Sequence, residues 1–267
     1  DVYRRGGDSL HGRYHAYRLH PLSLAEAGGG RDVLDGLLRL GGFPEPFLRG
    51  EERHWRRWQR ERIDRVVRDD VRDLERVREV SLIEVLIDAL PSRVGSPLSV
   101  KSLREDLSVA HDTAERWLGI LENLYVCFRI PPFGPARIRA VKKEQKLYLW
   151  DWSMVEDPGA RFENLVASHL LKLCHFAEDT EGYRMELRFL RDTDKREVDF
   201  VVLRDRKPLF AVEAKTGERG VSPAIRYFRQ RTAIPHWYQV HLGTKDAVVD
   251  GVRILPFAKL SAELGIP

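Results

Sequence analysis

Apolar residues recur at helical spacing through the first half of the chain. The positions of Val33, Leu37 and Leu40 predict a helix that follows three consecutive glycines. The sequence Gly-Gly-Phe-Pro at 41–44 ends this helix, because proline cannot continue a helix and biases the residue before it to extended geometry. A long charged helix is then predicted over 51–79, with one apolar stripe formed by Trp55, Trp58, Ile63, Val66, Val67, Val71 and Leu74.

The predicted helices become shorter after residue 80. Four elements are predicted there: helices over 82–90, 99–107 and 111–124, and a strand over 125–130 that two prolines terminate. The order helix, short turn, helix, strand is typical of a winged helix-turn-helix. Residues 28–135 are therefore predicted to form a helical domain that contains a winged helix.

The last part of the chain, 136–267, is predicted to mix strands and helices. Its two clearest strands, 198–203 and 208–215, are joined by a polar hairpin loop and preceded by a helix over 162–176. We predict further strands over 147–150, 185–190, 236–242 and 252–255 and a helix over 222–232. The predicted fold class is α/β, with the helical domain followed by a mixed sheet that helices flank.

The first residues, 1–27, are too few to form a core of their own. Within them, Tyr14–Leu19 alternates like a strand, and a turn follows at Pro21. We interpret this segment as an edge piece of a larger structure.

Composition predicts a folded cytoplasmic protein with no membrane partner. Apolar residues make up 43% of the chain, which excludes wholesale disorder. No stretch approaches the roughly 18 apolar residues of a membrane span, and the first residues contain no apolar signal core. Only Cys127 and Cys174 are present, which excludes a disulfide scaffold and a cysteine-rich zinc site. The net charge of +4 permits an anionic partner without requiring one.

The strongest chemical signal is a set of ionisable residues in the predicted sheet. Glu213 and Lys215 alternate on one strand, which places both on the same face, and the hairpin brings Asp199 opposite Glu213. Glu163 lies in the preceding helix. Carboxylate oxygens suit Mg²⁺, or Mn²⁺ in its place, and a lysine beside the ion can stabilise a developing anion. Because the strands are apolar, we also expect a cation or lysine near the carboxylates.

These residues also permit a simpler interpretation. Asp199, Glu213 and Lys215 could form an ordinary ion pair on a sheet, and a glutamate near a helix N-terminus is favoured by the helix dipole alone. Folds of this kind are also retained after their chemistry is lost.

The order of these motifs resembles the PD-(D/E)xK nuclease superfamily over roughly the last 130 residues. Val198 precedes Asp199 where the superfamily pattern has proline. The chain also resembles the C-terminal portion of AAA-type ATPases that carry a DUF4143 domain. This resemblance rests on Leu10–Tyr14, Leu19–Ser23, Gly41–Glu45, Phe162–Val166, Glu197–Phe200 and Val212–Lys215.

The resemblance implies a DNA-related role and an ATPase core upstream. Residues 1–27 would be a remnant of that core, 28–135 the helical domain and 136–267 the nuclease-like domain. No GxxxxGK[ST] motif is present, so we expect no ATPase activity from this chain alone.

Several basic residues are candidates for nucleic-acid binding, each with a structural alternative. Arg116 on the helix over 111–124, with Lys101 and Arg104 before it, would contact DNA, although this winged helix could instead serve packing or dimerisation. The second group follows the acidic site and could equally be a basic helix surface: Arg226, Arg229 and Gln230. The arginines of the long helix, Arg53, Arg56, Arg57 and Arg60 among them, alternate with acidic residues, which favours a solvated face.

Two hypotheses follow from the sequence. The first is a Mg²⁺-dependent DNA endonuclease, in which Asp199, Glu213 and Glu163 bind the metal and Lys215 orients the attacking water. The alternative is a non-catalytic DNA-binding or assembly module of an AAA-type ATPase. A homo-oligomer is compatible with both.

Overall fold

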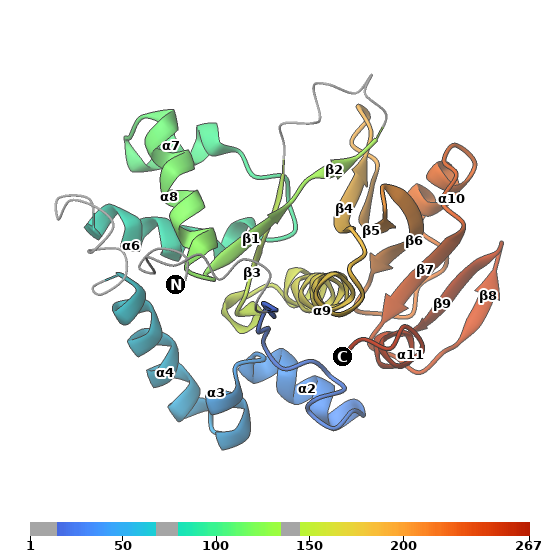
Figure 1. Ribbon diagram of the computed structural model, residues 1–267, viewed down its shortest axis with the longest axis horizontal. Helices are drawn as coiled ribbons and strands as arrows, with labels where there is room; N and C mark the ends of the chain where they lie inside the picture. The colour runs from blue at the N-terminus through green and yellow to red at the C-terminus, as the bar shows by residue number, and fades with distance from the viewer. Residues whose placement is uncertain (1–14, 68–79, 135–144) are drawn as a thin grey trace.

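The computed structural model describes residues 15–67, 80–134 and 145–267. It is a mixed α/β structure, with a helical region first and a seven-stranded mixed sheet with flanking helices after it (Figure 1). This confirms the predicted fold class. Among the described residues no helix is both long and apolar enough to cross a membrane.

The helical region begins with α2 (Arg31–Leu40), α3 (Pro44–Arg49) and α4 (Glu52–Arg65). Gly41 ends α2 with φ of 78°, and a Cβ atom there would lie 2.5 Å from Oδ1 of Asp151, so this position requires glycine. The long helix predicted over 51–79 is confirmed from Glu52 to Arg65. The part of that prediction over 68–79 lies outside the described residues.

The next elements have the order of a winged helix-turn-helix. Helix α6 (Val80–Ala89) and a 3₁₀ turn, η3 (Pro91–Arg93), precede α7 (Val100–Leu107) and α8 (His111–Asn123). Strand β1 (Cys127–Ile130) follows and pairs antiparallel with β3 (Lys146–Leu149). We call the pair β1 and β3 the wing.

The large sheet has the strand order β2-β4-β5-β6-β7-β9-β8. The antiparallel pairs are β4–β5, β5–β6 and β8–β9, and the others are parallel. The strands are β2 (Pro132–Phe133), β4 (Met185–Arg191), β5 (Glu197–Arg204), β6 (Lys207–Ala214), β7 (His236–His241), β8 (Ala247–Val249) and β9 (Val252–Pro256). Strand β2 precedes residue 135, the predicted domain boundary, but belongs to the large sheet. Strand β3 follows that boundary but pairs with β1 in the wing.

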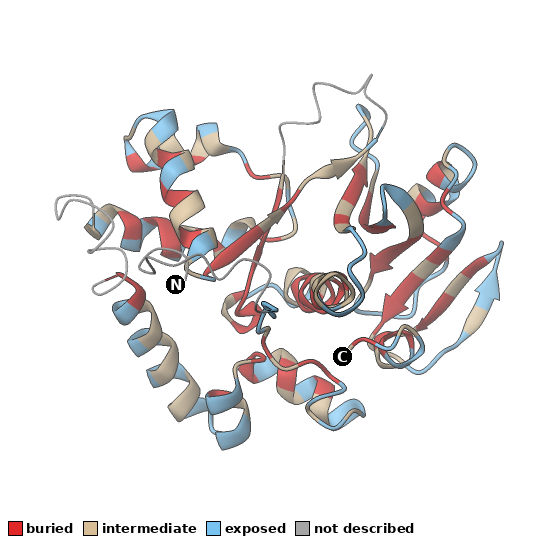
Figure 2. Ribbon diagram, viewed as in Figure 1, coloured by how far each residue is buried: buried red, intermediate tan, exposed pale blue. Residues whose placement is uncertain are grey.

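Helices cover both faces of this sheet. Helix α9 (Pro158–Glu181) lies between the wing and the large sheet, and most of its inner positions are buried (Figure 2). Its core cluster includes Phe162, Phe200 and Val212 and continues into the helical region. A second core cluster forms beneath α10 (Pro223–Arg229). A short helix, η5 (Trp152–Met154), precedes α9, and α11 (Phe257–Glu263) follows the last strand.

The strand predicted over Tyr14–Leu19 is wrong for its described residues, because 15–20 pair with no strand. Their extended backbone lies against α9 instead. The backbone N–H of Arg18 donates to the Asp179 carboxylate at 2.9 Å, and the rings of His20 and His175 are hydrogen-bonded at 2.9 Å. Side-chain contacts with a helix therefore replace the strand partner that the alternation suggested. The rest of the predicted ATPase remnant, 1–14, lies outside the described residues.

Candidate active site

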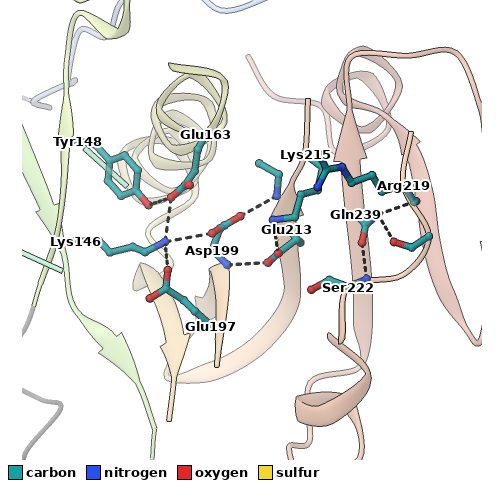
Figure 3. Close-up of polar contacts among 12 residues, drawn as sticks. Lys146, Tyr148, Glu163, Glu197, Asp199, Glu213, Lys215, Arg219, Ser222 and Gln239 are labelled. Carbon is teal, nitrogen blue, oxygen red and sulfur yellow. Dashed lines mark hydrogen bonds and ion pairs between the residues drawn. The ribbon is translucent and has the colours of Figure 1, made fainter. Parts of the chain in front are cut away.

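Asp199 of β5 and Glu213 of β6 lie side by side and are buried (Figure 3). The backbone N–H of Ala214 donates to Oδ2 of Asp199 at 2.9 Å, and the backbone N–H of Asp199 donates to Oε2 of Glu213 at 3.3 Å. Because each strand supplies a donor to the other strand's carboxylate, the antiparallel pairing fixes both side chains at the site.

Lys215 follows β6 and turns toward the same site. Its Nζ atom lies 2.6 Å from Oε1 of Glu213, and its side chain remains 34% exposed. Its backbone N–H donates to the carbonyl of Val240 at 2.9 Å, which anchors the residue to β7. The predicted proximity of Glu213 and Lys215 is therefore present in the structure.

Glu163 reaches the site from the first turns of α9. The helix begins at Pro158, and Asp157 caps it by accepting from the backbone N–H of Ala160 at 2.7 Å. Oε1 of Glu163 accepts hydrogen bonds from the Tyr148 hydroxyl at 2.8 Å and from Lys146 Nζ at 3.0 Å. The four residues predicted from the sequence thus lie in one cluster.

The structure adds Lys146, Tyr148 and Glu197 to this cluster. Lys146 Nζ lies 2.6 Å from Oε1 of Glu197 and 3.2 Å from Oδ1 of Asp199, in addition to its contact with Glu163 (Figure 3). The sequence contains a signal for Glu197, because it lies two positions before Asp199 on the same strand. Only the tertiary structure brings the two strands together.

The cluster carries more negative than positive groups. Four carboxylates against the ammonium groups of Lys146 and Lys215 and the guanidinium group of Arg191, which lies 2.9 Å from Oε2 of Glu197, leave a formal charge of −1 when all are ionised. Burial, followed by the charge of Asp199, raises the pKa of Glu163 to about 7 and that of Glu213 to about 8. The site is therefore stabilised by protons or by a further cation.

Mg²⁺ fits this donor set. Within the described ranges, no three or more His, Cys, Asp or Glu side chains are arranged to hold a metal together. Asp199 and Glu213 are the adjacent carboxylates from which an ion would be held, and metal binding by Asp199, Glu213 and Glu163 stays a prediction. Mg²⁺ is usually held by one or two carboxylates together with waters and substrate phosphates, and its charge would offset the net negative charge of the cluster.

A pocket of about 330 Å³ opens beside the cluster. It lies between the loop of residues 94–96, the start of α9 and the residues after β6, and its lining includes Glu163, Lys215 and Arg219. Gly95 has φ of 76°, and a Cβ atom there would lie 3.1 Å from Oε2 of Glu163, so glycine allows the loop to approach the carboxylate. A larger hollow of about 450 Å³, at β2 and β4, is lined by none of the predicted catalytic residues.

Two family models match consecutive parts of the chain. Residues 158–260 match the model described as a domain of unknown function, DUF4143, and residues 31–157 match the one described as DUF8612. The chain carries a DUF4143 domain preceded by a DUF8612 domain. No curated protein and no solved structure matches it significantly.

The acidic site lies where these two domains meet. Glu163, Glu197, Asp199, Glu213 and Lys215 belong to the DUF4143 domain. Lys146 and Tyr148 come from the wing at the end of the DUF8612 domain, as does the 94–96 loop of the pocket.

The loop after β6 of the DUF4143 domain is held by Gln239, which is buried. Its Oε1 accepts from the backbone N–H of Ser222 at 2.8 Å, and its Nε2 donates to the carbonyls of Arg219 and Gly220 at 3.0 and 3.1 Å. Gln239 is in register with Glu213 on the neighbouring strand. It therefore fixes the position of Arg219 relative to the acidic pair.

The predicted DNA-binding residues of the DUF8612 domain lie on α7 and α8, away from the pocket lining. Lys101 and Arg104 each lie 3.9 Å from Oε1 of Glu105, and Arg116 is on α8. Their role in DNA binding stays a prediction.

The predicted DNA-binding residues of the DUF4143 domain also lie outside the pocket lining. Arg226 is 3.4 Å from the Asp250 carboxylate, and Arg229 donates to the Asp250 carbonyl. Gln230 caps the C-terminus of α10. Both arginines therefore have contacts with the turn before β9, and their contact with DNA stays a prediction.

Proposed function

We propose that this chain is a Mg²⁺-dependent nuclease of the PD-(D/E)xK type that hydrolyses phosphodiester bonds in DNA. The observation that carries the proposal is the convergence of Asp199, Glu213 and Lys215 beside an open pocket. The donor set of two neighbouring carboxylates and the net negative charge of the cluster support a divalent ion at this place.

In this proposal the position of each residue in the site determines its role. Asp199 and Glu213 would hold Mg²⁺, which when bound lowers the pKa of a coordinated water and offsets charge on the phosphate. Lys215, one-third exposed at the pocket, would orient the attacking water and stabilise the developing anion. Arg219 adds a second cation to the pocket lining, where a phosphate of the substrate would lie.

The test is cleavage of supercoiled plasmid and of single-stranded DNA in Mg²⁺ or Mn²⁺. We expect the wild type and a control variant at an exposed lysine, Lys259→Ala, to cleave. The variants Asp199→Asn and Lys215→Ala should lose about 100-fold or more in rate, the loss typical of removing a group that stabilises a transition state. Equal cleavage by the wild type and Lys215→Ala would overturn the assignment.

A second candidate function is favoured by a different observation. The carboxylates already have protein cations as partners, because Lys146 contacts Asp199 and Lys215 contacts Glu213. This supports a non-catalytic DNA-binding or assembly module of an AAA-type ATPase, in which the nuclease-like fold is retained without its chemistry. DNA binding without cleavage in the same experiment would support this candidate.

A further inference from the structure

Lys146 is a fully buried cation at the centre of the acidic cluster. Its side chain is 0% exposed, and its Nζ atom contacts the carboxylates of Glu163, Glu197 and Asp199. Three carboxylates therefore surround the ammonium group and hold it at the centre of the site.

The backbone on both sides of Lys146 is fixed. Residue 146 pairs with Ile130 in the wing and forms an isolated bridge with Pro97. Its neighbours accept hydrogen bonds from the loop, since Leu98 N–H donates to the Gln145 carbonyl at 2.8 Å and Gly95 N–H to the Leu147 carbonyl at 3.2 Å. These contacts fix the point in the fold from which the side chain of Lys146 reaches the carboxylates.

Asp199 divides the cluster into two sides. Its Oδ1 faces Lys146, which also holds Glu163, whereas its Oδ2 accepts from Ala214 N–H on the side of Glu213. In two-metal sites, two ions about 3.5–4 Å apart clamp the attacking and leaving oxygens. Here a protein ammonium already lies on one side of Asp199.

We propose that the ammonium group of Lys146 takes the place of a second divalent ion, so that the site binds a single ion, between Asp199 and Glu213. This inference rests on the proposed function. The charges agree with it, because one divalent ion already outweighs the formal −1 of the cluster, and a second ion would add two more positive charges beside Lys146, Lys215 and Arg191. Glu163 then serves to position Lys146 and is not a ligand of the metal.

The experiment measures the number and affinity of Mn²⁺ ions bound by the full chain, using electron paramagnetic resonance and calorimetry. We expect one ion per chain in the wild type. Asp199→Asn and Glu213→Gln should abolish its binding, whereas Glu163→Gln should leave one ion with a Kd within about threefold of the wild type. Lys146→Met should bind a second ion, because it vacates the Glu163 side.

The outcomes separate the two proposals. No Mn²⁺ bound by the wild type would overturn the proposed function and this inference together. Two ions in the wild type would leave the proposed function standing and overturn the inference. Loss of the ion in Glu163→Gln would also overturn the inference. A single bound ion in Lys146→Met would overturn it too, provided that circular dichroism shows this variant to be folded. If Lys146→Met does not fold, the number of ions that Glu163→Gln binds decides the question.

Discussion

The Nζ atom of Lys146 lies 3.2 Å from Oδ1 of Asp199, although the two residues are 53 positions apart in the sequence. The lysine belongs to the wing at the end of the DUF8612 domain, and the aspartate belongs to the sheet of the DUF4143 domain. The two domains therefore build the acidic site together.

Replacing Lys146 by methionine should destabilise the fold strongly. The variant leaves the buried Asp199 and the half-buried Glu163 without their shared cation and leaves Glu197 with Arg191 alone, and breaking a buried ion pair from one side costs about 3–5 kcal/mol. Urea denaturation without divalent metal would measure the loss. The matched control is Lys101→Met, which removes an exposed lysine 3.9 Å from Glu105 and should cost at most about 1 kcal/mol. Equal losses for the two variants would contradict the central role of Lys146.

Stability without metal should fall as the pH rises from about 4.5 to about 8. Burial and the charge of Asp199 raise the pKa of Glu213 to about 8 and that of Glu163 to about 7, from ordinary values of 4.5. The folded chain therefore binds more protons than the unfolded chain in this window. Their contribution to stability is complete below pH 4.5 and is lost as the pH passes the folded pKa values.

Urea denaturation in EDTA at several pH values would test this dependence. The variant Glu213→Gln should show a smaller loss of stability between pH 5 and pH 8.5, because its amide does not ionise. A dependence identical to that of the wild type would show that Glu213 does not carry the raised pKa.

Gln239→Leu should loosen the loop that carries Arg219. The leucine leaves the backbone N–H of Ser222 and the carbonyls of Arg219 and Gly220 without their partner, at a cost of about 1–3 kcal/mol. We expect a lower midpoint of thermal unfolding and faster amide hydrogen exchange over residues 215–222. Gln230→Leu, at the exposed end of α10, is the control and should leave that exchange unchanged. Unchanged exchange in both variants would mean that other contacts hold the loop.

Arg219→Gln should weaken the binding of single-stranded DNA more than Arg226→Gln does. Arg219 lines the pocket beside Lys215, whereas Arg226 lies 3.4 Å from the Asp250 carboxylate and is absent from the pocket lining. Titrations at several salt concentrations should show a slope of log K against log salt reduced by about 1 for Arg219→Gln. A larger change for Arg226→Gln would place the DNA on α10 instead.

The sequence predicted most of the elements because their patterns are local. The strands predicted over 198–203 and 208–215 correspond to β5 and β6, and the polar hairpin loop predicted between them agrees with their antiparallel pairing. The helix over 111–124 is confirmed as α8, and Ser99 caps α7 by accepting from Ser102 N–H at 3.2 Å. The alternation of Tyr14–Leu19 was misleading, because it does not correspond to burial: residues 15–19 are all exposed, and contacts with α9 take the place of a strand partner.

The residues of the candidate site were likewise only partly predictable from the sequence. Asp199, Glu213 and Lys215 were predictable together, because they lie on two strands of one hairpin, and alternation within a strand fixes which side chains share a face. Lys146 was not predictable. Its contact with Asp199 depends on how the wing packs against α9 and the large sheet, and no local pattern specifies the packing of elements so distant in the chain. The sequence required a cation near the buried carboxylates, and only the tertiary structure decided which residue supplies it.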